Sequence, residues 1–156
     1  MFYLIPVLLV LGYAVYSWYW QATISIYAKY RVSSLIWALL LLTFAFNSGM
    51  VNKGDLFIQI FLAGFILMSI VDGFGGISTD RIIISGYFKR SLKYSELAKI
   101  TLIPVPRAKK PSVMAIFTTL KNQSYYLRFS KTIEELIPLL NDQTTDQVEI
   151  EIQNLV

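Results

Sequence analysis

The chain has 156 residues, of which 55% are hydrophobic and only 15% are charged. Soluble domains carry about 25% charged residues, so this composition predicts that part of the chain is embedded in a membrane. Cysteine and histidine are both absent, which excludes disulfides, thiol nucleophiles, Cys-ligated metals and the commonest general base near neutral pH. The composition therefore favours a non-enzymatic protein without a cofactor or a metal ion.

Three apolar runs occupy the first 72 residues, and they predict three transmembrane helices: residues 2–20, 32–46 and 56–71. A membrane span needs about 20 residues. The first run is long enough, and we expect polar-tolerant flanks such as residues 47–51 to complete the slightly short second and third runs. Buried helices of a soluble protein are the alternative interpretation. Residues 1–73 are thus expected to form a three-helix transmembrane region.

The basic residues between the runs predict an orientation in the cell (plasma) membrane. Lys29 and Arg31 lie in the first connection, only Lys53 lies in the second, and the segment after the third run is rich in cations. The positive-inside rule then places the N-terminus outside and the C-terminal half in the cytoplasm. Trp20 and Trp37 agree, because both would lie at the inner interface. We therefore expect a multi-pass protein with its C-terminal domain in the cytoplasm.

A glycine cluster follows the third run. Asp72 ends that run and is expected at the membrane interface, without an apparent partner inside the membrane, and Gly73, Gly75 and Gly76 come next. A phosphate-binding loop needs a strand before it and a helix after it. Here an apolar helix precedes the glycines and a strand follows them, so the cluster is predicted to be a linker that leaves the helix rather than a nucleotide site.

The pattern beyond Gly76 is typical of short strands followed by one helix. A hairpin is expected to turn at Gly86, a strand is expected at residues 95–105, and a second hairpin is expected to turn at residues 121–123. Apolar residues then recur at helical spacing, at Ile133, Leu136, Ile137 and Leu140. Thr132 and Glu135 fit a capping box that begins this helix.

The stretch "STDRIIISGYFKRSLKYSELAKI" resembles the opening of bacterial PH-like (pleckstrin-homology-like) domains in their membrane-anchored form. The resemblance covers residues 74–142. It implies a small α+β fold, an antiparallel β-barrel or sandwich with a C-terminal helix, in which one strand is missing or is supplied by the segment before Thr79. The basic spacing with which eukaryotic PH domains bind inositol phosphates is not evident, so that ligand is not carried over.

Charge divides the C-terminal half into a basic unit and an acidic tail. Eleven basic and five acidic residues lie from Gly73 to Asp142, and three acidic residues follow. Two basic clusters are candidates for binding lipid or a protein partner: Lys89, Arg90, Lys93, Arg107, Lys109 and Lys110. Each cation near an anionic leaflet contributes about 1 kcal/mol. The alternative is a solvated cytoplasmic surface that obeys the positive-inside bias.

The tail, residues 143–156, alternates Val148, Ile150 and Ile152 with acidic residues, which is strand spacing. It is predicted to be an edge strand of its own domain or of a partner, with disorder as the competing interpretation.

Taken together, these features predict a membrane protein whose cytoplasmic PH-like domain is a binding or adaptor module. Its expected partners are the lipid bilayer and a membrane or cytoplasmic protein, or a second copy of the chain, but not nucleic acid. Two other functions stay open: self-protection (immunity) against a membrane-active bacterial peptide, and an accessory role in a transporter.

Overall fold

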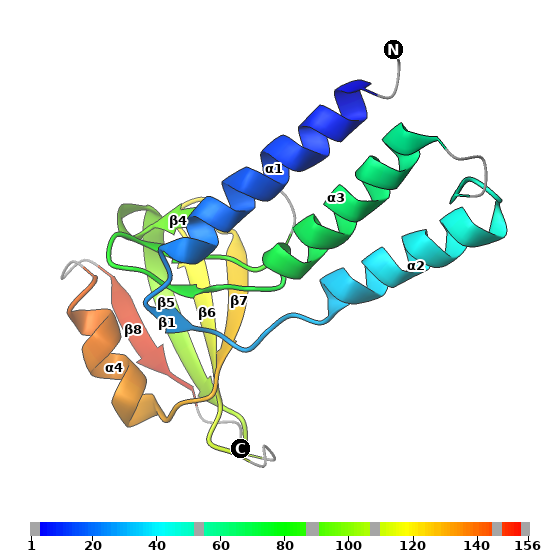
Figure 1. Cartoon of the computed structure of the whole chain (residues 1–156). Coiled ribbons are helices and arrows are strands. Elements are labelled where there is room, and N and C mark those ends of the chain that lie inside the picture. Colours follow the sequence, from blue (N-terminus) through cyan, green and yellow to red (C-terminus); the bar gives the residue numbers. More distant parts are fainter. Residues whose placement is uncertain (1–3, 52–54, 87–90, 107–109, 145–147, 154–156) are drawn as a thin grey trace.

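The computed structural model describes residues 4–51, 55–86, 91–106, 110–144 and 148–153. Three apolar helices project side by side from a β-rich domain that holds the C-terminal half of the chain (Figure 1). In chain order these helices are α1 (Leu4–Ala22), α2 (Ser33–Asn47) and α3 (Leu56–Asp72). Helix α3 packs against both α1 and α2, and we call the three together the helical layer.

The prediction of three transmembrane helices is wrong. Among the described residues only α1, with 19 residues, is both long and apolar enough to cross a membrane. At a rise of 1.5 Å per residue α1 spans about 28 Å, close to the hydrocarbon thickness of a bilayer. Helices α2 and α3 have 15 and 17 residues and fall short of that length. The structure therefore supports one candidate span near the N-terminus and membrane association, but not a multi-pass topology.

The polar flanks that were expected to lengthen these helices end them instead. The Asn47 side chain donates a hydrogen bond to the Thr43 carbonyl at 2.9 Å, within the last turn of α2. The backbone turns immediately afterwards, at Gly49, where φ is +68°. Helix α3 begins with a similar constraint, because the Asp55 side chain accepts a hydrogen bond from the Phe57 amide and so caps the helix. Local capping chemistry thus decides the helix lengths.

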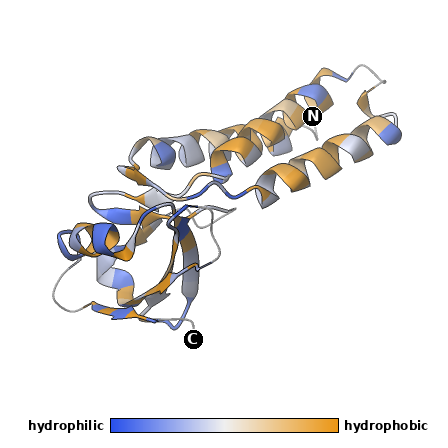
Figure 2. Ribbon diagram, turned by 90° about the horizontal axis from the view of Figure 1, so that it is seen from below, coloured by the Kyte–Doolittle hydropathy of each residue, from blue (hydrophilic) through white to orange (hydrophobic). Residues whose placement is uncertain are grey.

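The helical layer exposes most of its large apolar residues, and many of its buried positions are small or polar, although Val7, Leu62, Met68 and Val71 are also buried. Its buried positions include Ala14, Ser17, Ala38, Ala45 and Ser69. Its exposed side chains are mostly leucine, isoleucine, valine and aromatic residues, and only 17% of the apolar window of α1 is buried. Figure 2 shows this as hydrophobic colour along most of the three helices, whereas the β-rich domain is mixed.

The β-rich domain contains two four-stranded sheets. The first has the order β1-β2-β3-β4 and is antiparallel throughout: β1 (Ile26–Tyr27), β2 (Gly76–Ile77), β3 (Arg81–Ile83) and β4 (Ser91–Lys93). The second has the order β7-β6-β5-β8: β7 (Ser124–Phe129), β6 (Val113–Thr119), β5 (Leu97–Pro104) and β8 (Glu149–Ile152). A short 3₁₀ helix, η2 (Tyr94–Glu96), connects β4 to β5.

Both predicted hairpins are present, with one difference in a turn. Strands β6 and β7 pair antiparallel around residues 120–123, and Asn122 adopts a left-handed φ of 62° there. Strands β3 and β4 also pair antiparallel, but β3 ends at Ile83 and β4 begins at Ser91. The connection is therefore longer than the tight turn at Gly86 that the sequence suggested.

One helix, α4 (Ile133–Asn141), follows the strands and contributes to the core of the β-rich domain. The predicted capping box is confirmed, with Thr132 and Glu135 exchanging side-chain-to-backbone hydrogen bonds. Leu136 and Leu140 are fully buried, in the same cluster as Phe117 of β6. The helical spacing read from the sequence thus marks the buried face of α4.

Two strands come from outside the segment that resembles a PH-like domain. Strand β1 belongs to the connection between α1 and α2, and it pairs with β2. Strand β8 forms from the acidic tail, pairs parallel with β5 and becomes the edge strand of the second sheet. An ion pair of 2.6 Å joins Lys99 to Glu151 across this edge, and its hydrogen bond raises the pKa of Lys99. The strand spacing of the tail is therefore used within its own sheet.

Candidate functional site at the junction of helices and sheets

The glycine cluster allows the backbone to pack closely where the helical layer meets the first sheet. A Cβ atom on Gly76 would clash with the Ile26 carbonyl oxygen of β1. On Gly75 it would lie 2.8 Å from the Ser85 amide nitrogen, and on Gly73 it would overlap the Tyr30 ring. These glycines serve close packing, and a strand rather than a helix follows them, as the sequence indicated.

The α1–α2 connection is held against this cluster by backbone hydrogen bonds. Ser25 donates to the Ile77 carbonyl at 2.9 Å, and Ala28 donates to the Gly75 carbonyl at 2.8 Å. At the end of the connection, the Arg31 amide donates to the carbonyl of Gly73 at 2.9 Å. The connection is thus part of the β-rich domain, and it fixes the position from which α2 starts.

Asp72, the last residue of α3, connects this helix to α1 and to the segment after β3. Its side chain is fully buried; Oδ1 accepts a hydrogen bond of 2.6 Å from Ser17 of α1, and Oδ2 accepts one of 3.3 Å from Tyr13. Its backbone carbonyl accepts a hydrogen bond of 2.9 Å from Gly86, beyond β3. The expectation that Asp72 has no partner among the apolar helices is therefore wrong. A carboxylate bonded in this way fixes the end of α3 against α1.

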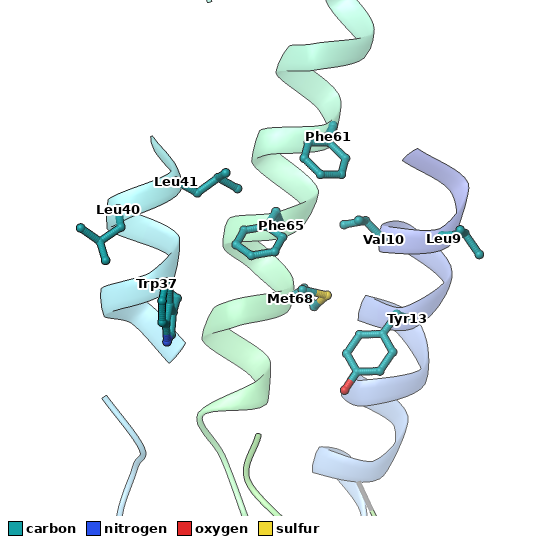
Figure 3. A pocket seen from close by; sticks show the side chains of 9 residues that line it. All are labelled: Leu9, Val10, Tyr13, Trp37, Leu40, Leu41, Phe61, Phe65 and Met68. Atoms are coloured by element: carbon teal, nitrogen blue, oxygen red, sulfur yellow. The ribbon is translucent and has the colours of Figure 1, made fainter. Parts of the chain in front are cut away.

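An apolar groove of about 900 Å³ runs between α1 and α2, over α3. Figure 3 shows side chains from all three helices around it: Leu9, Val10, Tyr13, Trp37, Leu40, Leu41, Phe61, Phe65 and Met68. A second, smaller hollow of about 350 Å³ shares Leu41 and Phe61 with it. The phenol of Tyr13, which reaches Asp72, provides a polar group beside a lining that is otherwise almost entirely apolar.

Exposed aromatic side chains surround the junction. Trp18 and Tyr19 lie at the end of α1, Tyr27 lies on β1, and Trp37 lies in the second turn of α2; all four are exposed. Trp20 instead lies under the guanidinium of Arg81, whose carbon is 4.5 Å from the ring centroid. Aromatic rings gathered near one end of apolar helices are typical of a membrane–water interface.

A polar pocket of about 410 Å³ lies at the same end of the helical layer. Three separate segments line it: Arg31 before α2, Ile84 and Ser85 after β3, and residues 124–126 at the start of β7. Arg31 is fixed in place by two hydrogen bonds, from Nε to Ser33 Oγ at 2.8 Å and from Nη1 to the Ser85 carbonyl at 3.2 Å. This arrangement holds a cation at the wall of a polar cavity.

The basic clusters predicted from the sequence lie largely outside the described residues. This applies to Lys89 and Arg90 and also to Arg107 and Lys109. Lys93 is exposed at the end of β4, opposite Arg81 in the strand register. Lys110 is exposed as well, before β6. Neither of these two lysines lines the polar pocket.

Acid–base and metal chemistry have little support at the junction. In the part of the chain that the structure describes, no group of three or more acidic, histidine or cysteine residues is placed to hold a metal ion. Burial, and secondarily the charge of Asp80, raise the pKa of Tyr94 well above its usual range. Its hydroxyl donates to the Ser78 carbonyl at 2.8 Å, which is a structural role.

Comparison of the chain with protein-family models, with curated proteins and with solved structures gives no match. The functional interpretation of the site therefore depends on its geometry alone. Sequence reasoning used Arg31 only to orient the helices and did not pair Asp72 with Ser17. One signal was available for the second: Ser17 and Asp72 are among the few polar residues of the long apolar runs, and such residues tend to pair across helices. No comparable signal connects Arg31 to residues 124–126.

Proposed function

We propose that this protein is a non-enzymatic, membrane-anchored binding module. The helical layer contacts lipid, with α1 as the membrane span. The β-rich domain is held at the inner, cytoplasmic surface of the cell membrane, where it binds a partner. The observation that carries the proposal is the distribution of side chains in the helical layer, where most of the large apolar residues are exposed while several alanines and serines are buried.

In water this distribution would be strongly unfavourable. Monomeric soluble proteins rarely expose contiguous apolar patches beyond a few hundred Å². In lipid, by contrast, helices associate through small residues and through hydrogen bonds between polar side chains. Gly64 fits this pattern, because α1 side chains lie only 3.2 Å from where its Cβ would be. The Ser17–Asp72 hydrogen bond is the corresponding polar contact.

The β-rich domain supports the second half of the proposal. Antiparallel strands followed by α4 suit the PH-like fold that the sequence resembles, although β1 and the parallel strand β8 are additions to it. Such a domain, without histidine or cysteine, suits binding better than catalysis. The cations Lys29 and Arg31 at the junction support the inner side of the membrane for it. Self-protection and a transporter role stay predictions that no particular contact favours.

Vesicle flotation after an alkaline wash tests the anchor. Leu8 and Val15 are exposed on α1, seven residues apart and so on one face. Each lysine placed near the centre of a spanning helix costs about 2.5 to 3.5 kcal/mol of insertion. We expect the double variant Leu8→Lys, Val15→Lys to be lost from vesicles, while the wild-type chain floats with them.

Leu120→Lys is the matched control. Leu120 is the most exposed large apolar residue described, but it lies in the β6–β7 turn, away from the helical layer. This variant should float like the wild type. A wild-type chain that the alkaline wash removes from vesicles would refute the anchor, as would a double variant that floats unchanged.

A further inference from the structure

We propose that the polar pocket beside Arg31 binds the phosphate group of an anionic phospholipid. This inference rests on the proposed function, because the lipid must lie against the junction. It goes beyond that function by naming a specific ligand class and the residues that bind it. The residues are Arg31, which precedes α2, and Ser124 and Tyr126 of β7, and all three line the pocket.

The charge of Arg31 is available to a ligand. In the described part of the chain, no carboxylate forms an ion pair with this guanidinium, and its hydrogen bonds are those to Ser33 and Ser85. These two hydrogen bonds use two of the five N–H groups of the guanidinium. Guanidinium groups bind phosphate through paired N–H donors, and they are the preferred side chain for such recognition. Arg31 is thus fixed in orientation while keeping donors for an anion.

Hydroxyl groups of β7 provide further donors. Tyr126 is 61% exposed, and among the described residues its hydroxyl has no hydrogen-bond partner. Ser124 Oγ lies 3.3 Å from Thr118 Oγ1, and either oxygen can be the donor of that bond, so Ser124 is able to turn its proton to a ligand. A cation flanked by hydroxyls is chemically suited to a phosphate, and about 410 Å³ accommodates a headgroup of glycerol phosphate size.

The position of the pocket identifies the source of the phosphate. Arg31 precedes the first residue of α2 by two positions, at the end of the helical layer where Trp18, Tyr19 and Trp37 are exposed. Aromatic side chains of this kind lie at the level of lipid headgroups. The pocket is therefore at the depth where phospholipid phosphates are concentrated, whereas a soluble phosphate would have to compete with them.

Native mass spectrometry of the full chain tests this assignment. The protein is reconstituted in equal amounts of phosphatidylglycerol and phosphatidylcholine, transferred to mild detergent, and its retained lipids are measured. We expect the wild type to retain phosphatidylglycerol preferentially and Arg31→Gln to lower that retention about tenfold, as for a lost charge-assisted hydrogen bond. Lys29→Gln removes the same charge two residues away, from a side chain outside the pocket, and should change retention less than about twofold.

Tyr126→Phe keeps the assignment testable if Arg31→Gln unfolds, because it removes one exposed oxygen and no packing. It should lower the retention of phosphatidylglycerol about threefold. Equal losses in Arg31→Gln and Lys29→Gln would overturn the site in favour of general surface charge. Displacement of the lipid by millimolar glycerol phosphate or inorganic phosphate would overturn the lipid as its ligand.

The two proposals fail in different ways. A wild-type chain that floats with vesicles but retains both lipids equally refutes the phosphate site and leaves the anchor intact. A wild-type chain that does not float refutes the anchor and, with it, the lipid site.

Discussion

The helical layer and the β-rich domain place the same residue types in opposite positions. In the β-rich domain, Phe117, Phe129, Leu136 and Leu140 are fully buried. In the helical layer, Phe44, Phe46 and Trp37 are exposed, while Ala14, Ser17, Ala38, Ala45 and Ser69 are buried. One chain thus follows two packing rules, and the difference is explained if its two parts fold against different solvents. The hydrophobic effect stabilises the first region, and close contact between helices stabilises the second.

The largest difference in stability is expected when one phenylalanine is removed from each region. Phe117→Ala leaves a cavity in the β-rich core and should lower the free energy of unfolding by about 3 to 5 kcal/mol. Phe44→Ala removes a ring that is 61% exposed on α2 and should change stability in detergent by less than about 1 kcal/mol. Denaturant unfolding of the full chain in detergent measures both. Similar losses in the two variants would contradict the contrast.

A pair of glycines gives the next largest effect. An added Cβ on Gly64 of α3 lies 3.2 Å from Leu11 and from Val10 of α1, whereas one on Gly12 of α1 meets nothing within 4 Å. Gly64→Ile should therefore force the helices apart and cost about 1 to 3 kcal/mol. Gly12→Ile should be neutral or slightly stabilising, because glycine is a poor helix former.

Spin-label distances between α1 and α3 report the helix separation directly. A Gly64→Ile variant with an unchanged distance and unchanged stability would show that close approach does not hold the helical layer together.

The smallest expected effect is a change in how the stability of the β-rich domain depends on pH. Folding raises the pKa of Tyr94, while in the unfolded chain this phenol ionises near its ordinary pKa of 10.0. The unfolded state then loses the proton first, so the free energy of unfolding falls as pH rises above about 10. Tyr94→Phe should make this fall shallower, although it costs about 1 kcal/mol near pH 8 through loss of the hydrogen bond to Ser78.

Tyr126→Phe is the control near pH 8: this side chain is exposed, and among the described residues its hydroxyl has no hydrogen-bond partner, so the free energy of unfolding should change by less than about 0.5 kcal/mol. Unfolding curves of Tyr94→Phe and wild type that stay parallel through alkaline pH would refute the role of Tyr94.

Elements with a clear periodic pattern were predictable, and elements made by distant contacts were not. The spacing of Leu136 and Leu140 and the pair Thr132 and Glu135 define α4 locally, so sequence sufficed there. The end of α2 depends on how Asn47 bonds to its own helix, which hydropathy does not register. Strand β1 has two residues, too few for any alternation to be seen.

The candidate site shows the same limit. Arg31 carries a charge that the sequence reveals, but its pocket needs Ser85 and Tyr126, which approach only after both sheets have formed. The basic clusters are recognisable from the sequence because their members are neighbours along the chain. The polar pocket instead is lined by residues more than 90 positions apart in the sequence. No local sequence pattern predicts that such distant residues lie together.

Strand β1 also limits how freely this chain can be divided. Strand β1, between α1 and α2, pairs with β2. Two residues further on, the backbone amide of Lys29 donates a hydrogen bond of 2.5 Å to the Arg128 carbonyl of β7. A cut after Gly73 would leave β2 with an unpaired edge, which favours sheet-to-sheet aggregation. The two halves are therefore not interchangeable modules: a recombination event that exchanged the helices alone would also remove a strand from the sheet, so anchor and sheet are expected to be inherited as one unit.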